Sequence, residues 1–383
     1  MSASLVLHHK PRSRHRERFL QQLLDSAGVH LNGSQPFDLT VRSDAFYSKA
    51  LPRGVTGILD AYVDGWWECE RLDELTCRVL LTHADLPAAG RMFRFLTSTS
   101  ARLLNLQSLR RAVQVRRHYD LGNDLFEAML DRRMVYSCAH WKDAANLDEA
   151  QEAKLDLAAR KLRLRPGMRM LDIGCGWGSF AKFAAERYGV SAVGITLSKE
   201  QVALGQRLCA GLPVELRLKD YRELGGERFD AIVSIGMFEH VGYKNYSTFM
   251  GVVKSHLKPD GLFLLHTIGS NVSRISTEPW IDRNIFPAGM LPSVEQIAAA
   301  AEGLFVMEDW HNFGADYDRT LMAWFENFRS AWPRLCERYG DRFFRLWKCY
   351  LLTCAGAFRA RDMQLWQIVF SPSGVPRGYC SPR

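Results

Sequence analysis

Two patterns of apolar and polar residues divide the chain. From about residue 165 onward, short apolar runs alternate with segments of helical spacing, which is the pattern of βαβ units around a parallel sheet. Before that point, apolar residues repeat at helical spacing over residues 16–27, and a short strand is indicated at residues 37–41. We therefore expect a small N-terminal domain over residues 1–105 and a larger domain over residues 106–383.

The larger domain is predicted to hold seven strands. The apolar runs that indicate them lie at residues 168–173, 192–196, 213–218, 229–235, 261–268, 305–310 and 363–370. In the N-terminal domain, the aromatic-rich stretch over residues 54–69 is expected to pack in a core, and no chemistry is assigned to it.

Composition narrows the class of protein. With 383 residues, of which 47% are hydrophobic, the chain can bury a globular core. No apolar run is long enough to span a bilayer, and the basic start lacks the apolar region of a signal peptide, so we expect a cytoplasmic protein. Nine cysteines without a C-x-x-C pair favour reduced thiols over disulfides or a zinc site, and no metal is expected.

The net charge of +8 is concentrated near the N-terminus, where residues 1–118 hold 17 Lys and Arg against 11 Asp and Glu. Within them, seven arginines of the basic segment, residues 91–117, alternate with apolar residues and no acid. Such a segment suits an anionic membrane surface. An ordinary solvated helix face explains it equally well, and nucleic-acid binding is less favoured because no nucleic-acid module is visible.

A glycine-rich turn follows the first strand of the larger domain. Gly174, Gly176 and Gly178 have the spacing G-x-G-x-G, and the second strand ends without the acid that a dinucleotide site uses for a ribose hydroxyl. The glycine spacing and the missing acid disfavour NAD as the cofactor. Asp172 before the turn and Asp220 after the third strand match the polar groups around S-adenosylmethionine, although a glycine turn can also serve packing alone.

The seven strands and this turn predict an α/β fold, a seven-stranded Rossmann-like sheet of the S-adenosylmethionine-dependent methyltransferase type whose last strand is antiparallel. Several ordered blocks then resemble the bacterial cyclopropane-fatty-acid synthases. They read RHYDLGNDLF at 117–126, MVYSCA at 134–139, GITLSKEQ at 194–201, SIGMFEHVG at 234–242, HTIG at 266–269, WIDRNIFP at 280–287 and NFGADY at 312–317.

This resemblance implies methylene transfer from S-adenosylmethionine to a cis double bond in the acyl chain of a membrane phospholipid, with a bound bicarbonate as general base. It implies that Cys138, Glu239, His266, Tyr317 and the backbone of Ile268 hold the bicarbonate. The cofactor-binding residues that it implies are Tyr136, Ser137, Asp172, Gly174, Gly176, Thr196, Gln201, Asp220 and Tyr221. Tyr221 stands where the family often has Trp.

Some of these residues also have a physical case of their own. Glu239 follows an apolar run at the carboxyl end of a predicted strand, where open α/β sheets bind ligands and where an unpaired buried carboxyl would be costly. His266 interrupts an apolar strand, although a satisfied core histidine would look the same. Cys138 and Tyr317 depend on the motif match. Cys354 is interpreted as lining the substrate pocket rather than as a nucleophile.

Two other functions stay open at this stage. The same carbocation could be quenched to leave a methyl-branched or methylene-substituted chain, and a non-catalytic lipid-surface or nucleic-acid module could retain the fold. The resemblance also implies contact with a phospholipid bilayer that contains unsaturated acyl chains, a homodimer, peripheral association with the inner membrane from the cytoplasm, and no nucleic acid.

Overall fold

The computed structural model describes residues 11–82, 122–275 and 277–383. The chain forms two compact units, one from residues 1–97 with 332–360 and the other from residues 98–331 with 361–383. The predicted domain boundary at residue 105 and the basic segment lie outside the described residues. Residues 332–360, which we expected in the larger domain, join the N-terminal residues in the first unit.

The first unit is mainly helical in its described residues. Its N-terminal part consists of α1 (Pro11–Asp25), β1 (Thr40–Val41), α2 (Ala45–Val63), β2 (Trp67–Glu68) and α3 (Leu72–Leu81), with β1 and β2 antiparallel. The predicted first helix is confirmed as α1. The strand predicted at residues 37–41 is shorter than expected, because only Thr40 and Val41 pair with a neighbouring strand.

The aromatic-rich stretch over residues 54–69 packs in the core of this unit, as predicted. Tyr62 and Trp67 are each 1% exposed, and the Trp67 indole donates a hydrogen bond to the carbonyl of Ile58 at 2.9 Å. The end of the long helix α13 (Ala315–Arg359) contributes Arg345, which donates to the carbonyls of Tyr62 and Trp67 at 2.7 and 3.0 Å. Charged side chains therefore tie residues 332–360 to this unit.

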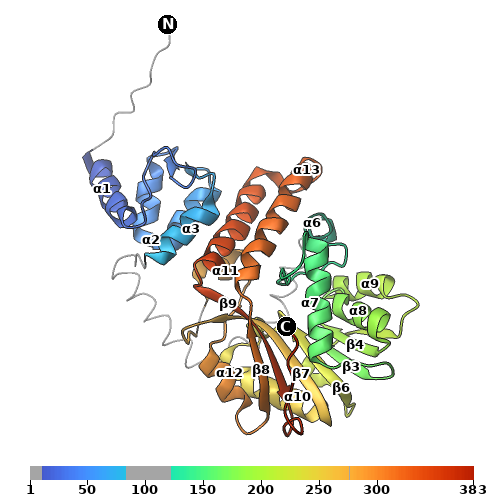
Figure 1. Ribbon diagram of the computed structural model, residues 1–383. Coiled ribbons are helices and arrows are strands. Elements are labelled where there is room, and N and C mark those ends of the chain that lie inside the picture. The colour runs from blue at the N-terminus through green and yellow to red at the C-terminus, as the bar shows by residue number, and fades with distance from the viewer. Residues whose placement is uncertain (1–10, 83–121, 276) are drawn as a thin grey trace. The chain divides into compact units, whose positions relative to one another are not determined.

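The second unit contains the seven-stranded sheet, in the order β5-β4-β3-β6-β7-β9-β8 (Figure 1). β3 to β7 are mutually parallel, and β9 is antiparallel to both of its neighbours. The sequence prediction of seven strands with an antiparallel last one is confirmed. Their bounds are β3 (Arg169–Ile173), β4 (Ser191–Thr196), β5 (Val214–Leu218), β6 (Phe229–Ile235), β7 (Leu257–Ser270), β8 (Val306–Asn312) and β9 (Met363–Ser371).

Both faces of the sheet are covered, which explains why its central strands are almost continuously apolar. Alternate residues of β3 point to opposite faces: Leu171 joins a core cluster with α10 and α12, whereas Met170 joins a second cluster with α7 and α8. The helices and turns of this unit are α6 (Asn123–Met129), α7 (Leu147–Lys161), α8 (Ser179–Tyr188), α9 (Lys199–Leu208), η1 (Tyr221–Glu223), η2 (Phe238–His240), η3 (Tyr243–Asn245), α10 (Tyr246–His256), α11 (Pro279–Asn284) and α12 (Val294–Ala301).

None of the helices within the described residues combines the length and apolar character that crossing a bilayer would require.

Candidate active site

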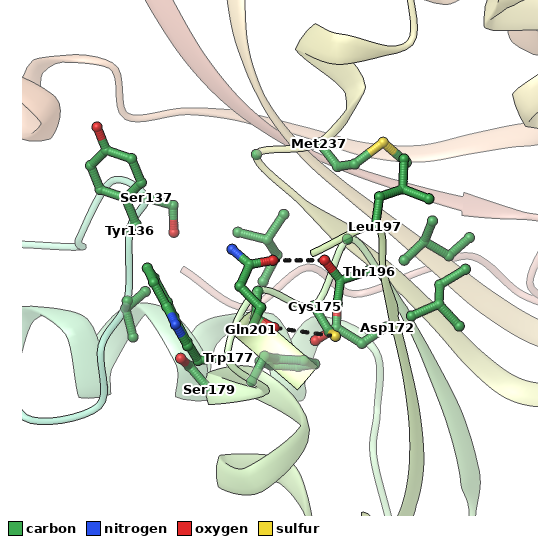
Figure 2. Close-up of a pocket in the computed structure, with 18 of the residues that line it drawn as sticks. Tyr136, Ser137, Asp172, Cys175, Trp177, Ser179, Thr196, Leu197, Gln201 and Met237 are labelled. Carbon is green, nitrogen blue, oxygen red and sulfur yellow. Dashed lines mark hydrogen bonds between the residues drawn. The ribbon is translucent and has the colours of Figure 1, made fainter. Parts of the chain in front are cut away.

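A pocket opens at the carboxyl ends of β3, β4 and β6, and all nine residues predicted to bind the cofactor line it. It contains about 1020 Å³ of empty space, part of which is open solvent. In Figure 2, Tyr136 and Ser137 lie on the side opposite Thr196, Leu197 and Met237. We call this the cofactor pocket.

The glycine turn between β3 and α8 has a backbone that only glycine adopts easily. Gly174 has φ +83° and Gly176 has φ +56°, and a Cβ on Gly174 would lie 2.6 Å from the Met237 side chain. The amides of Gly174 and Cys175 donate to the carbonyl of Ile195 at 2.9 and 3.0 Å. These two N–H groups therefore hold the turn against β4, and the turn gives space to a ligand.

Asp172 lies one residue before the carboxyl end of β3, lines the cofactor pocket and is 2% exposed. Burial raises the pKa of its carboxyl to about 7, and the charge of Lys154 opposes that rise. Lys154 is completely buried on α7 and donates to the hydroxyl of Ser137 at 2.9 Å. Burial lowers the pKa of Lys154 to about 8, against the charges of Asp131, Cys138 and Asp172.

The remaining predicted cofactor residues pair with near neighbours. The Thr196 hydroxyl donates to Oε1 of Gln201 at 2.6 Å (Figure 2). Asp220 accepts from the backbone and the guanidinium of Arg222 at 3.0 and 2.8 Å. Tyr221 is 4% exposed and packs edge-on against the ring of Phe249, with 5.2 Å between centroids, so an aromatic face is retained at this position.

Glu239 lies in η2, just after β6, and is 7% exposed. Its Oε1 accepts a hydrogen bond from the backbone amide of Ile268 at 2.7 Å. Burial raises the pKa of the carboxyl to about 7, and this hydrogen bond opposes the rise. Within the described residues, Oε2 has no hydrogen-bond partner. The Ile268 amide thus supports the carboxylate of Glu239, and the expected contact of the Ile268 backbone with the anion stays a prediction.

His266 lies on β7, two residues before Ile268, so both point to the same face of the sheet. Burial, with the charges of Lys154 and Lys161, places the pKa of its imidazole well below the usual range, and the ring is therefore neutral. Its Nδ1 lies 3.3 Å from Nε2 of Gln367 on β9. Its Nε2 is buried and finds no partner in the part of the chain that the structure describes.

Cys138 lies close to Thr320 of α13, the helix that also carries Tyr317. The Cys138 thiol is fully buried and lies 4.0 Å from the Thr320 hydroxyl, which also accepts from the indole of Trp141 at 3.0 Å. Burial raises the pKa of Cys138 well above its usual range, so it is a neutral thiol. Tyr317 lies one turn before Thr320 on α13, 8% exposed. We call Cys138, Glu239, His266, Ile268 and Tyr317 the inner cluster.

Three buried residues of this region were not predicted: Lys154, Thr320 and Gln367. Lys154 had a detectable signal, since it lies on the stripe formed by Leu147, Gln151 and Leu155, where a helix facing a core should be apolar. Thr320 and Gln367 had no such signal in the sequence, because their partners come from other strands and segments.

Cys354 lies on the part of α13 that belongs to the first unit, where it is half buried. The residues that line the cofactor pocket all belong to the second unit. The expected role of Cys354 in a substrate pocket stays a prediction. Across the described residues, no group of three His, Cys, Asp or Glu side chains is placed to hold a metal ion.

The sheet order and the pocket are those of the S-adenosylmethionine-dependent methyltransferases. The crystal structure of coclaurine N-methyltransferase bound to N-methylheliamine and S-adenosylhomocysteine covers 83% of this chain and 99% of its own, with a TM-score of 0.68 and 19% identity, which shows the fold alone. Residues 107–368 match the sequence profile of the mycolic acid cyclopropane synthetase family, and the chain belongs to this family.

Individual relatives agree with this assignment. The cyclopropane-fatty-acyl-phospholipid synthase of Escherichia coli K12 is 54% identical over 94% of both chains. Cyclopropane mycolic acid synthase 1 of Mycobacterium tuberculosis is 38% identical, over 64% of this chain and 92% of its own. The structure of mycolic acid cyclopropane synthase CmaA1 with S-adenosylhomocysteine and CTAB is 34% identical, covers 68% of this chain and 97% of its own, and has a TM-score of 0.62. The cofactor is accordingly S-adenosylmethionine.

Proposed function

We propose that this chain transfers a methylene group from S-adenosylmethionine to the cis double bond of unsaturated acyl chains in membrane phospholipids, forming cyclopropane fatty acids. The observation that carries the proposal is the cofactor pocket at the carboxyl ends of β3, β4 and β6, beside which Glu239 is buried two residues after Met237 of the pocket lining. The identity of 54% to the Escherichia coli phospholipid synthase over 94% of both chains supports the choice of substrate.

When bound, S-adenosylmethionine supplies an electrophilic methyl carbon, and closure of a cyclopropane ring releases one of its protons. The inner cluster suits this reaction because burial disfavours the charged forms of Cys138, Glu239 and His266, so a developing carbocation meets little nucleophilic charge. Cys138 is a neutral thiol and His266 a neutral imidazole, and the raised pKa of Glu239 keeps much of its carboxyl protonated at neutral pH. Burial also excludes water, which would trap the cation as an alcohol.

We propose that the proton acceptor is a bicarbonate held by Cys138, Glu239, His266 and Tyr317. Two buried polar atoms support this ligand set: Oε2 of Glu239 and Nε2 of His266 have no hydrogen-bond partner among the described residues. Buried polar atoms without partners are rare in folded proteins, and a small anion with one O–H could satisfy both. In this proposal Ile268 acts by holding Oε1 of Glu239 through its backbone amide.

For the cofactor, we propose that the glycine turn gives room to the amino-acid part, with Tyr136, Ser137 and Asp172 around it. Thr196 and Gln201 would face the ribose side, and Asp220 and Tyr221 the adenine. Cys354 is proposed to line the acyl-chain pocket.

The partner is proposed to be a phospholipid bilayer, reached from the cytoplasm at the inner membrane through the N-terminal domain and the basic segment. A homodimer and the absence of nucleic-acid binding belong to the same proposal. Binding to anionic vesicles that weakens with added salt would support the membrane contact, because surface charges are screened. Binding that does not depend on salt, or no binding, would favour the interpretation of the basic segment as an ordinary solvated helix face.

The decisive experiment uses vesicles with monounsaturated phospholipid and S-adenosylmethionine that carries a CD₃ group. Ring closure leaves two deuterium atoms in the product, because one leaves with the base, and the product resists ozonolysis. A methyl-branched product would keep all three deuterium atoms. A methylene-substituted chain would keep two but would be cleaved by ozone, so the two measurements separate all three reactions.

A further inference from the structure

Gln367 contacts His266 because of the sheet register. It is fully buried on β9, directly opposite His266 on β7 and directly opposite His311 on β8. Directly opposed residues of antiparallel strands point to the same face, so the three side chains form one row across the sheet. Nε2 of Gln367 lies 3.3 Å from Nδ1 of His266.

This contact determines which nitrogen of His266 carries the proton. An amide nitrogen can only donate, so Nδ1 must accept, and a neutral imidazole then has its single proton on Nε2. The ring is neutral, since burial with the charges of Lys154 and Lys161 lowers the pKa of His266. The Nε2–H group is thus a buried donor, and the described residues offer it no acceptor.

The opposite orientation of the amide is less favourable. Oε1 of Gln367 is buried without a hydrogen-bond partner among the described residues. Exchanging the oxygen and nitrogen would leave an NH₂ group with two unpaired donors at that place. An orphaned carbonyl oxygen is tolerated more readily in protein interiors than orphaned N–H groups.

The surroundings of the row also disfavour a second proton on His266. Lys161 of α7 lies 3.1 Å from Nδ1 of His311, and its ammonium group lies 3.4 Å from Asp309. Lys154 approaches from the same helix, and the uncharged ring of Phe313 packs edge-on against His266 with 5.9 Å between centroids. The charges of two buried lysines thus act on the ring, and among the described residues no carboxylate is hydrogen-bonded to it.

We propose that Gln367 is a positioning residue that holds His266 as the Nε2–H tautomer, so that this N–H donates to the anion bound beside Glu239. The role of that anion rests on the proposed function, whereas the tautomer rests only on the contact of Gln367 with His266. Gln367 itself touches neither substrate nor cofactor in this proposal. A side chain that accepts from Nδ1 would move the proton and turn Nε2 into an acceptor that faces the anion.

The test is nitrogen NMR of the full-length enzyme labelled with ¹⁵N-histidine, in which the His266 signals are assigned by their loss in His266→Gln. In the wild-type enzyme we expect Nε2 to be protonated and Nδ1 unprotonated. In Gln367→Glu the carboxylate should draw the proton to Nδ1. Turnover should then fall by about 10²-fold or more, the size of effect typical of misplaced acid–base groups, with the dissociation constant of S-adenosylmethionine unchanged.

Gln367→Met removes the donor to Nδ1 of His266 without supplying an acceptor in its place. We therefore expect both tautomers of His266 and a fall in turnover of about tenfold. The matched control is Gln364→Met, a buried glutamine of the same strand that bonds to Asn312 and Arg361 instead. It should leave the His266 signals unchanged.

A wild-type enzyme with its proton on Nδ1 would overturn the proposal, as would full activity and unchanged signals in Gln367→Glu. If a variant fails to fold, which loss of cofactor binding would reveal, the wild-type spectrum alone decides. If the wild-type enzyme makes no cyclopropane lipid, the proposed function fails while the tautomer is still measured.

Discussion

The cofactor pocket and the inner cluster are built in different ways. The pocket draws on residues 134–240, and its polar groups pair with one another, as Thr196 does with Gln201 and Lys154 with Ser137. The inner cluster draws on β7, α13 and the segments around Cys138 and Glu239, and it leaves Oε2 of Glu239 and Nε2 of His266 unpaired in the described structure. Polar side chains of the pocket such as Thr196 and Ser137 are thus paired within the protein, whereas the inner cluster keeps two buried polar atoms without partners among the described residues.

Glu239→Gln should break the inner cluster and leave the cofactor pocket intact. The amide fills the same volume but lacks the charge, so turnover should fall by about 10²-fold or more while S-adenosylmethionine binds as before. Calorimetry and the lipid assay measure the two effects. Glu227→Gln, at a partly exposed ion pair with Arg169 and Arg217, is the matched control. Retention of more than about a tenth of the rate in Glu239→Gln would contradict the assignment.

Removal of carbonate should affect the inner cluster and leave the cofactor pocket unchanged. In degassed, carbonate-free buffer we expect activity to fall about tenfold or more, as loss of general-base catalysis implies, and to recover saturably when bicarbonate is added. Cys138→Ala and Tyr317→Ala should weaken this bicarbonate response and leave cofactor affinity unchanged. An enzyme that runs at full rate without carbonate would require another base.

Lys154→Met should affect both regions, because Lys154 bonds to Ser137 and its charge reaches Asp172 and Cys138. Without this charge the pKa of Asp172, already raised to about 7, should rise further, so its carboxylate form should be lost at a higher pH than in the wild type. We expect about tenfold weaker S-adenosylmethionine binding at neutral pH, the effect of about one pKa unit, and partial recovery at higher pH.

Calorimetry between pH 6 and pH 9 checks this expectation. Lys161→Met, at a second buried lysine of the same helix that pairs with Asp309, is the matched control. Equal effects of the two substitutions on cofactor affinity would show that Lys154 acts through packing alone.

A further expected effect concerns stability. The pKa of Glu239 is raised from 4.5 to about 7 on folding, so its contribution to stability is fully present at low pH and is lost as the pH rises through 7. Glu239→Gln should therefore stabilise the protein more at pH 8 than at pH 5, by roughly 2 kcal/mol from the linkage relation. Thermal unfolding at the two pH values measures this difference.

Glu227→Gln serves as the control here too. Arg217 and Arg169 lower the pKa of Glu227 to about 2, so its contribution to stability is constant between pH 5 and pH 8. A stability difference for Glu239→Gln that does not depend on pH would mean that Glu239 is not buried in solution as it is in the structure.

The sequence predicts the sheet well because a strand buried on both faces is a continuous apolar run. Each of the seven strands was found within a few residues of its observed position; β7 differs most, since it begins at Leu257 rather than at residue 261. In the cofactor pocket, the glycine turn and Asp172 were predictable because ligands bind at the carboxyl ends of parallel strands, whereas Tyr136, Ser137, Thr196 and Gln201 were implied by the family resemblance.

The inner cluster was less predictable because its contacts join distant parts of the chain. Thr320 bonds to the amide of Ala139, 181 residues away, and Gln367 meets His266 across 101 residues. Only the register of β9 decides that Gln367, rather than a neighbour, faces His266. Likewise, we predicted no boundary within α13, where residues 332–360 join the first unit and Gly340, with φ +73°, interrupts the helical backbone.

The close approach of Gly174 to Met237 has a practical consequence for enzyme engineering. Synthetic sulfonium cofactors with bulkier alkyl groups need extra room in the cofactor pocket. The glycine turn cannot provide it, because glycine is already the smallest residue, and a Cβ at Gly174 would lie 2.6 Å from the Met237 side chain. Met237 is a flexible, unbranched side chain that lines the same pocket, so it is the position at which a library for such analogues should begin.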